Sequence, residues 1–243
     1  MSTKDVLVLM AGGYSDGNIQ KHLLSADGNY LFERVISAVP VKNVWIVHNK
    51  NTQGFWNGWY AREALTTFAD KSISFFLDKQ NSQGGIKNPA LWMTSGIPSL
   101  AMNYQKNAVI YSAIDTYFEN FNFMDELMSK ENAFVVTKED LGNSPSVDIN
   151  WRGKLNPTTV TVTGLVDGSG WAFADMVKAS TKNLLVSGQL PKGDMISVVQ
   201  NLRGRTHQEF DVVKYKGGFA NINTPEDLSK AESLYTVQNK VIV

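Results

Sequence analysis

A glycine pair that directly follows an apolar run is the first feature of this sequence with a chemical use. Residues 5–10 are mostly apolar and include two valines, which indicates a strand buried on both faces, and Ala-Gly-Gly follows at 11–13. Because glycine has no side chain, backbone N–H groups can approach a phosphate there. The ammonium of Lys21, the next cation along the chain, can reach such a phosphate. A tight turn between strand and loop explains the glycines equally well.

Two oxygen-bearing side chains further along the sequence are candidates for a metal site. Asp115 follows the apolar stretch 107–113, and ligands of open α/β sheets bind beyond the carboxyl ends of strands. A carboxylate there suits a Mg²⁺ ion that also binds phosphate oxygens, although an Asx turn or a helix cap accounts for Asp115 as well. Near the C-terminus, Asn223 or Thr224 is expected to cap a helix, and the side-chain oxygen of Asn223 can face the same crevice.

Alternating strands and helices predict the fold that must position these residues. Strands separated by helices at this spacing are typical of a doubly wound, mostly parallel α/β sheet of the Rossmann-like type. The expected strands are 5–10, 43–48, 73–77, 107–113, 133–137, 158–163 and 210–215, and the expected helices are 31–39, 59–69, 89–102, 123–130, 170–180, 195–202 and 225–235.

The second half of the chain is expected to add a smaller lobe. Residues 141–156 are rich in Gly, Asn, Ser and Pro and are expected to form a loop. We therefore expect one domain over residues 1–243, with 141–206 inserted in it as a smaller lobe.

Three residues of this lobe are candidates for ligand binding. Arg203 and Arg205 can hold a phosphate through bidentate hydrogen bonds, or they lie on a solvated loop. The indole of Trp171 is either a wall of a ligand pocket or part of the core.

Composition excludes several classes of protein. The 243 residues include 23 Lys and Arg and 23 Asp and Glu, and this zero net charge argues against a non-specific nucleic-acid binder. The chain has no cysteine, which excludes disulfides, thiolate zinc sites and cysteine nucleophiles. Its three histidines have no metal-ligand spacing. No apolar run is long enough to span a membrane and no secretory signal opens the chain, so we expect a cytoplasmic protein without a membrane partner.

Three segments together resemble the nucleotidyltransferases of the GT-A-like α/β fold, which include the sugar-phosphate nucleotidyltransferases and molybdenum-cofactor guanylyltransferase. Residues 10–13 with Lys21 resemble the glycine-rich signature L-A-G/A-G-x-G-x-R, which is followed by a lysine. Asp115 resembles the metal-binding Asp after the fourth strand, and the segment 219–228, FANINTPEDL, resembles the C-terminal N-T-P-E-D-L motif. The resemblance covers residues 5–137 and 207–235 in the family's order.

The resemblance implies a Mg²⁺-dependent reaction that joins an NTP to a small phosphorylated acceptor and releases pyrophosphate. Lys21 would contact phosphate and stabilise the leaving pyrophosphate, and Asp115 and Asn223 would hold the Mg²⁺ ion. The acceptor would be a sugar, polyol or amino-alcohol phosphate, and a homodimer is expected. The nucleotide would lie against the backbone of Ala11, Gly12 and Gly13 and its base against Gln83, Gly84 and Gly85. The lobe 141–206 would bind the acceptor, and Trp171, Arg203 and Arg205 would line the acceptor site.

The sequence departs from the family pattern in the glycine-rich loop. No arginine precedes Lys21, and the loop instead carries Asp16, which repels phosphate. Lys87, Arg203 or Arg205 could replace the missing cation. Tyr117 stands where the family usually has proline.

These departures leave alternatives open. Molybdenum-cofactor guanylyltransferase is the second candidate, and a nucleotide-binding member with weakened catalysis is a third. A glycosyltransferase of the same fold is a fourth, although Tyr117 occupies the place of the second Asp of its D-x-D metal motif.

Overall fold

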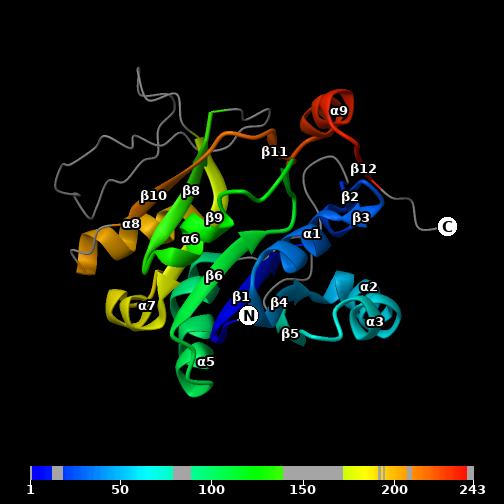
Figure 1. Cartoon of the computed structure of the whole chain (residues 1–243). Coiled ribbons are helices and arrows are strands. Elements are labelled where there is room, and N and C mark those ends of the chain that lie inside the picture. Colours follow the sequence, from blue (N-terminus) through cyan, green and yellow to red (C-terminus); the bar gives the residue numbers. More distant parts are fainter. Residues whose placement is uncertain are drawn as a thin grey trace.

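A seven-stranded sheet forms the centre of the computed structural model (Figure 1). The structure describes residues 2–12, 19–78, 89–138, 172–190, 193, 195–206 and 210–239, with side chains omitted for 203–206. The strand order is β10-β8-β9-β6-β1-β4-β5, and every neighbouring pair is parallel except the two that involve β9. The strands are β1 (Ser2–Ala11), β4 (Val41–Asn49), β5 (Ser72–Asp78), β6 (Ala108–Ala113), β8 (Ala133–Thr137), β9 (Ala172–Ser180) and β10 (Asp211–Tyr215).

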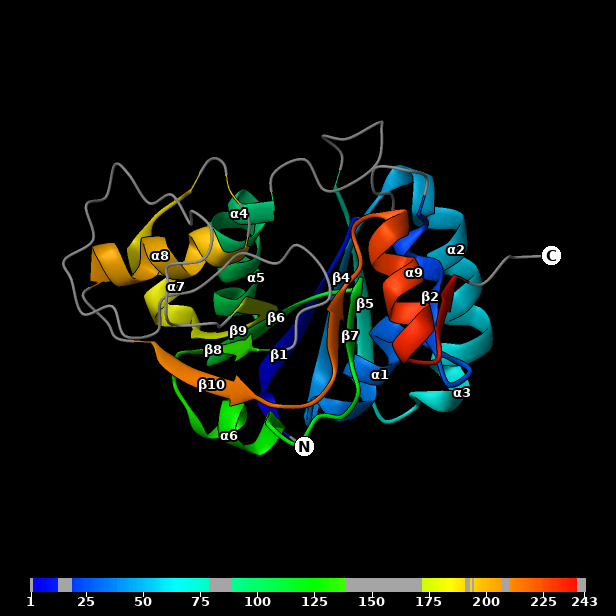
Figure 2. The ribbon, with the colours of Figure 1, turned by 90° about the horizontal axis from the view of Figure 1, so that it is seen from above.

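Helices cover both faces of this sheet, as the predicted doubly wound fold requires (Figure 2). Side chains of β1 alternate between two cores: Leu7 and Leu9 pack in one, and Val6 and Val8 pack in the other. The first core includes α1 (Leu31–Ala38), α2 (Gln53–Trp59) and α6 (Met124–Ser129), and the second includes α4 (Pro89–Leu91), α5 (Ile97–Asn103), α7 (Thr181–Ser187) and α8 (Met195–Thr206).

Two of the predicted helices contain a π-helical turn. The helix expected at 59–69 consists of the end of α2, a π-turn at Tyr60–Ala64 and α3 (Leu65–Thr67). The helix expected at 89–102 likewise has a π-turn, Trp92–Gly96, between α4 and α5. Both predictions are confirmed in position, and the backbone widens locally within each helix.

Two small antiparallel sheets bring the C-terminal segment to the end of β6. In one, β7 (Thr116–Phe118) pairs with β11 (Phe219–Asn221), and in the other, β2 (Leu24–Ala26) pairs with β3 (Asn29–Tyr30) and β12 (Val237–Asn239). A third core, which includes Leu24, Tyr117 and Ala231, joins these sheets to α9 (Pro225–Leu234). Residues far apart in sequence therefore meet at this edge.

The helix predicted at 170–180 is wrong, because Ala172–Ser180 forms β9. This strand lies between β6 and β8 and is buried on both faces, so most of its side chains are apolar and its pattern does not alternate. The remaining predicted helices and strands are confirmed within a few residues, except 158–163, which lies outside the described residues together with the loop 141–156.

The described part of the predicted lobe 141–206 consists of β9, α7 and α8. β9 lies within the central sheet and the two helices pack against one of its faces. Acceptor binding by this segment stays a prediction. Within the described ranges, no helix has the length and apolar character needed to cross a membrane.

Candidate functional site

Asp115 lies just beyond the carboxyl end of β6, where the sequence predicts a ligand site. Strand β6 is buried and pairs with β1 in parallel, which places Asp115 near the end of β1, where Gly12 follows. The backbone oxygen of Asp115 accepts a hydrogen bond of 3.0 Å from the N–H of Ile222. The C-terminal segment is thereby fixed beside Asp115.

Lys21 joins Asp115 and Asn223 through one ammonium group. Its Nζ atom forms an ion pair with Asp115 Oδ2 and donates a hydrogen bond of 2.7 Å to Asn223 Oδ1. The two partners lie 94 and 202 positions along the chain from Lys21, so the folded sheet alone brings them together. The structure thus assembles the three residues that the sequence singled out, while their catalytic and metal-binding roles stay predictions.

The cap of α9 holds Asn223 in place. Asp227 Oδ2 accepts hydrogen bonds from the backbone N–H groups of Asn223 and Thr224, at 3.1 and 3.0 Å. Thr224 Oγ1 accepts one in return from the N–H of Asp227, at 3.2 Å. Thr224 is therefore the helix cap, and the side chain of Asn223 is left to face Lys21.

Asn221 and Asp175 extend this network, and the sequence analysis missed both. Asn223 Nδ2 donates to Asn221 Oδ1 at 2.9 Å, and Asn221 Nδ2 donates to Asp175 Oδ2 at 2.6 Å. The Asn-x-Asn spacing at 221 and 223 was a usable signal, because residues two apart in an extended segment lie on the same face. Asp175 gave a weaker signal, as the one acidic residue of the mostly apolar stretch 170–180, which was expected to form a helix.

Asp175 occupies an irregular point of β9. Its φ of 47° lies in the left-handed region, which few residues other than glycine adopt. The pairing of β9 with β8 shifts at the same place, because Phe134 is opposite Val177 whereas Val136 is opposite Phe173. Strand β9 therefore advances by four residues while β8 advances by two, which is a bulge that changes the direction of the side chains within it.

A buried hydroxyl group lies beside Asn221. Thr116 is directly opposite Asn221 in the β7–β11 pair, so their side chains project from the same face of that ribbon. Thr116 is 2% exposed, and its Oγ1 atom has no hydrogen-bond partner in the described part of the chain. A buried polar atom of this kind usually finds a partner in water or a ligand.

The neighbouring parallel strands complete the edge on which these residues lie. In the sheet register Ala11 is opposite His48, and Asn49 is opposite Asp78, so the carboxyl ends of β1, β4 and β5 form one row. Asn49 Nδ2 donates to the backbone oxygen of Gly12 at 3.4 Å and so ties the residue that follows β1 to β4. Burial lowers the pKa of His48 below its ordinary 6.5.

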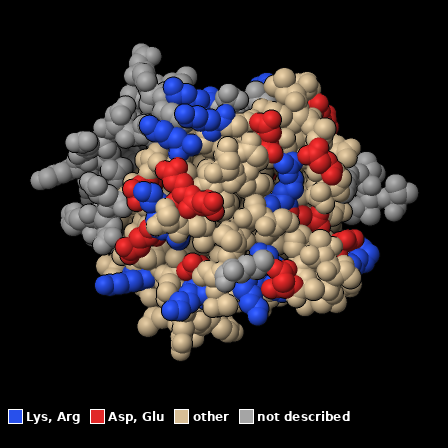
Figure 3. Space-filling model, viewed as in Figure 1, with Lys and Arg blue, Asp and Glu red and all other residues tan. Residues whose placement is uncertain are grey.

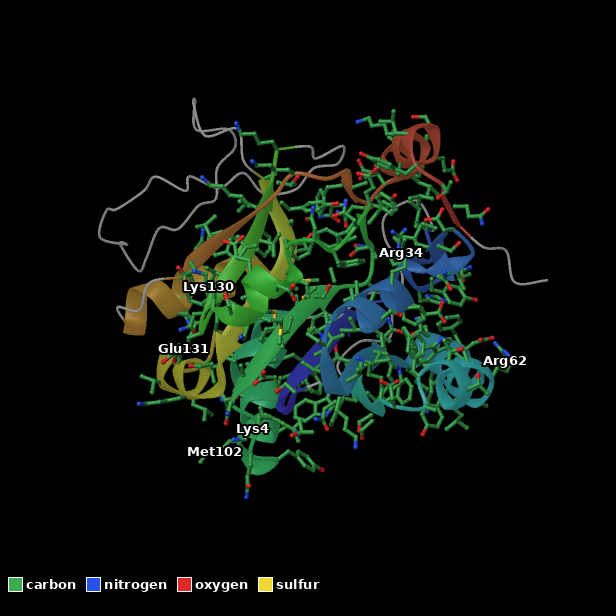
Figure 4. The ribbon with its side chains drawn as sticks, in the orientation of Figure 1. Lys4, Arg34, Arg62, Met102, Lys130 and Glu131 are labelled. Carbon is green, nitrogen blue, oxygen red and sulfur yellow. The ribbon has the colours of Figure 1, made fainter. Side chains whose placement is uncertain are left out.

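Tyr117, the residue that replaces the family proline, has a structural role. It is 4% exposed, and the guanidinium of Arg34 lies 4.9 Å from the centre of its ring. Arg34, labelled in Figure 4, also donates hydrogen bonds to the backbone oxygens of Phe118 and Glu119 at 2.9 and 3.1 Å. Burial raises the pKa of the Tyr117 hydroxyl, which keeps this ring neutral beside the cation.

The donor set around Lys21 fits a Mg²⁺ ion. Asp115 Oδ2 and Asn223 Oδ1 both surround one cationic group, so this position already accommodates positive charge. Carboxylate and amide oxygens are ligands that Mg²⁺ accepts, and the ion commonly uses one or two carboxylates together with substrate phosphates. No cluster of three or more His, Cys, Asp or Glu residues suited to a metal occurs within the described segments.

Charge on the face shown in Figure 3 is mixed, with basic and acidic side chains interspersed.

Several predicted site residues lie outside the described part of the structure, so their roles stay predictions. These are Gly13, Asp16, Gln83, Gly84, Gly85, Lys87 and Trp171. Arg203 and Arg205 belong to α8, which continues to Thr206. The alternative expectation, that they lie on a loop, is therefore wrong.

Comparisons with known proteins were made by sequence and by structure. No protein-family model and no curated protein sequence matches the chain. The solved structure of the inositol-1-phosphate CTP transferase from T. maritima is similar over 96% of this chain and 95% of that chain, with a TM-score of 0.61 and 14% identity. HddC from Yersinia pseudotuberculosis is similar over 94% and 98%, with a TM-score of 0.60 and 15% identity.

The solved structure of a nucleoside-diphosphate-sugar pyrophosphorylase from Vibrio cholerae RC9 is also similar to this chain. It is similar over 92% of this chain and 98% of that chain, with a TM-score of 0.60 and 13% identity. At such identities the similarity concerns the fold, and it extends over almost the whole of both chains. The predicted fold class is therefore confirmed, and the chain has the GT-A-like α/β fold of solved nucleotidyltransferases such as the inositol-1-phosphate CTP transferase.

Proposed function

We propose that this protein is a Mg²⁺-dependent nucleotidyltransferase that joins an NTP to a sugar, polyol or amino-alcohol phosphate and releases pyrophosphate. The observation that carries the proposal is the meeting of Lys21, Asp115 and Asn223 beyond the carboxyl ends of β1 and β6. The fold supports it, since solved proteins of this fold include an inositol-1-phosphate CTP transferase and a nucleoside-diphosphate-sugar pyrophosphorylase.

In the proposed reaction, a phosphate oxygen of the acceptor forms a bond to the α-phosphorus of the NTP. The bond between that phosphorus and the pyrophosphate oxygen breaks in line with the attack, and no covalent enzyme intermediate is needed. An ionised acceptor phosphate has no proton to lose, so the chain need not supply a general base. Catalysis then comes from positioning the two substrates and stabilising the charge that develops.

Lys21 has two roles in this scheme. Without substrate, its ammonium neutralises Asp115, which is only 6% exposed. With the nucleotide in place, the ammonium turns to the phosphates and stabilises negative charge on the departing pyrophosphate. A Mg²⁺ ion, held by Asp115 and Asn223 where the lysine had been, would neutralise further phosphate charge.

Nucleotide binding is the first test of the proposal. The melting temperature is measured with ATP, GTP, CTP, UTP and dTTP, each with and without Mg²⁺. A ligand at about 100 times its dissociation constant stabilises by about 2.7 kcal/mol, which raises the melting temperature by several degrees at this size. A Mg²⁺-dependent rise with one nucleotide is expected, and it also identifies the base; a response to GTP alone would favour the molybdenum-cofactor alternative.

Catalysis is tested by pyrophosphate release with that nucleotide and with glucose 1-phosphate or inositol 1-phosphate as acceptor. Asp115→Asn keeps the shape of the side chain but removes its charge, so release should fall at least 100-fold while the melting temperature changes little. The control is Asp125→Asn, which changes an exposed carboxylate of α6. An Asp115→Asn protein that is as active as the control would refute the assignment of the site.

A further inference from the structure

A line of four side chains connects the candidate site to β9. In order, Asp175, Asn221, Asn223 and Lys21 are joined by hydrogen bonds of 2.6, 2.9 and 2.7 Å. Each of the two amides lies between two neighbours and contributes its Nδ2 atom to one and its Oδ1 atom to the other. The line therefore has a direction: in each of the three hydrogen bonds, the residue closer to Lys21 is the donor.

Hydrogen-bonding chemistry at the two ends sets this direction. The carboxylate of Asp175 accepts hydrogen bonds and donates none, whereas the ammonium of Lys21 donates and accepts none. An amide between them has one accepting and one donating atom. Asn221 must therefore turn Nδ2 toward Asp175 and Oδ1 toward Asn223, and Asn223 must in turn present its Oδ1 to Lys21. The opposite orientation would bring a donor against Lys21 and two acceptors together at Asp175.

Burial makes the wrong orientation costly. Asn221 is 6% exposed, so an amide turned the wrong way there cannot be satisfied by water. Hydrogen bonds also strengthen one another in such surroundings, and a mismatched member weakens the whole line. The orientation of Asn223 is thus coupled to a carboxylate that it does not touch.

The backbone at Asp175 points to the same conclusion. A residue other than glycine rarely has a φ near 47°, and it persists there only where the surrounding structure requires it. The bulge in β9 directs this side chain toward Asn221, while the adjacent Phe173, Ala174 and Met176 are fully buried among apolar residues. The strand thus departs from regular geometry where its single carboxylate meets the line of amides.

We propose that Asp175 is a positioning residue, whose carboxylate fixes the orientation of the Asn221 and Asn223 amides so that Asn223 presents its oxygen to the cation site. In the free protein Lys21 favours the same orientation from the other end. When Lys21 turns to a phosphate, as the proposed function requires, Asp175 is the end that maintains it. That a cation other than Lys21 binds beside Asn223 rests on the proposed function. The role of Asp175 in orienting the two amides does not depend on it.

A cycle of two substitutions tests this role. In Asn223→Asp, Asn221 lies between two carboxylates and one of them meets its Oδ1 atom, so the protein is destabilised. In Asp175→Asn/Asn223→Asp, the line can reverse: Asn221 Nδ2 donates to the new carboxylate, and the new amide at position 175 donates to Asn221 Oδ1. The double variant has the same net charge as the unmodified chain, so only the place of the carboxylate differs.

Three measurements are needed on each of four proteins: the unmodified chain, Asp175→Asn, Asn223→Asp and the double variant. The melting temperature of the ligand-free protein should fall by several degrees in Asn223→Asp and recover by at least half of that loss in the double variant. NOE contacts of the Asn221 Nδ2 protons should move from the β-protons of residue 175 to those of residue 223 in the double variant. Affinity for Mg²⁺ with the responding nucleotide should fall about twofold in Asp175→Asn, since neither end fixes the orientation once Lys21 has turned to the phosphate and half of the molecules then present the wrong amide atom.

Each outcome decides the proposal. Coupling between the two sites and reversal of the NOE pattern support it, as does a double variant that folds when Asn223→Asp alone does not. The proposal is overturned if the losses of melting temperature are additive or the NOE pattern is unchanged. It is also overturned if neither Asn223→Asp nor the double variant folds. If coupling and reversal are found but the unmodified chain binds no nucleotide, the orienting role stands and the proposed function fails.

Asp175→Gly separates the carboxylate from the backbone. Glycine adopts the left-handed conformation readily, so the bulge should persist while the acceptor for Asn221 is lost. The same twofold loss of affinity is expected. Unchanged affinity would show that the carboxylate does not position Asn223.

Discussion

The carboxylate of Asp227 holds the backbone on which Asn223 lies, so its removal should affect both stability and the site. Asp227 is 2% exposed, and its Oδ2 atom accepts hydrogen bonds from two consecutive N–H groups at the start of α9. These groups have no partner within the helix, because the first turn of a helix leaves its N–H groups unpaired. The substitution Asp227→Ala removes both hydrogen bonds and leaves the N–H groups of Asn223 and Thr224 to water.

The size of the effect follows from these contacts. Hydrogen bonds to a charged group contribute about 1.5–3 kcal/mol each, and the loss of a helix cap costs about 0.5–2 kcal/mol. Asn223 and Thr224 are half-buried, so hydrogen bonds to water compensate for part of the stability lost with the carboxylate. We therefore expect Asp227→Ala to lower the free energy of unfolding by about 2–3 kcal/mol, which lowers the melting temperature by about 4–12 °C at this chain length. Asp227→Asn keeps an accepting oxygen and should lose about a third as much.

Urea and thermal unfolding measure the stability of these variants, and titration with the responding nucleotide and Mg²⁺ measures the site. Affinity should fall in Asp227→Ala, because the backbone of Asn223 is no longer held. The control is Glu226→Ala, which removes an exposed carboxylate from the same helical turn. If Asp227→Ala unfolds at the same urea concentration as this control, the two backbone hydrogen bonds do not stabilise the C-terminal segment and the reasoning fails.

Three further predictions concern other parts of the chain. Lys21→Met should increase the affinity of the ligand-free protein for Mn²⁺, because Asp115 loses its ion-pair partner, and should decrease nucleotide affinity; calorimetry measures both, and equal signs would contradict the two roles of Lys21. Gln105→Gly should raise the melting temperature by about 1–3 °C, since this exposed residue directly follows the C-cap of α5 and has a φ of 53°, a conformation that favours glycine. Burial lowers the pKa of His48 below 6.5, so its neutral form is favoured in the folded state. Stability should therefore decrease as the pH falls below about 6.5, and His48→Gln should show a smaller decrease between pH 7.5 and 5.5.

The order of elements along the first half of the chain could be predicted because each signal is local. Strands β1, β4 and β6 each contain a continuous apolar run, and such runs bounded by turn residues are typical of parallel strands buried on both faces. Asp115 was found by the same logic, as the first carboxylate after such a run. The proximity of Asn223 could be predicted only from its place in a motif, since 108 residues of chain separate it from Asp115 and no local pattern spans that distance.

Strand β9 could not be predicted from its own residues. The stretch Ala-Phe-Ala-Asp-Met-Val-Lys-Ala-Ser suits one face of a helix as well as a strand buried on both faces, and periodicity does not separate the two for so short a run. Its conformation is decided by β6 and β8, between which it lies. Asp175 was missed for that reason, because its contact with Asn221 exists only once β9 is part of the sheet.

The position of β9 also constrains the sequence of folding events. Among the described strands, β5, β4, β1 and β6 pair only with one another and with β9, and all four precede residue 114. Strand β8 is the next strand of the central sheet along the chain, but its sheet neighbours β9 and β10 begin at residues 172 and 211. During synthesis a parallel four-stranded sheet can therefore form early, with β6 as an open edge, while β8 must wait for β9 to close that edge. Because Asp175 arrives with the same strand and Asn221 later still, nucleotide-binding competence should appear only after the last strands have been made.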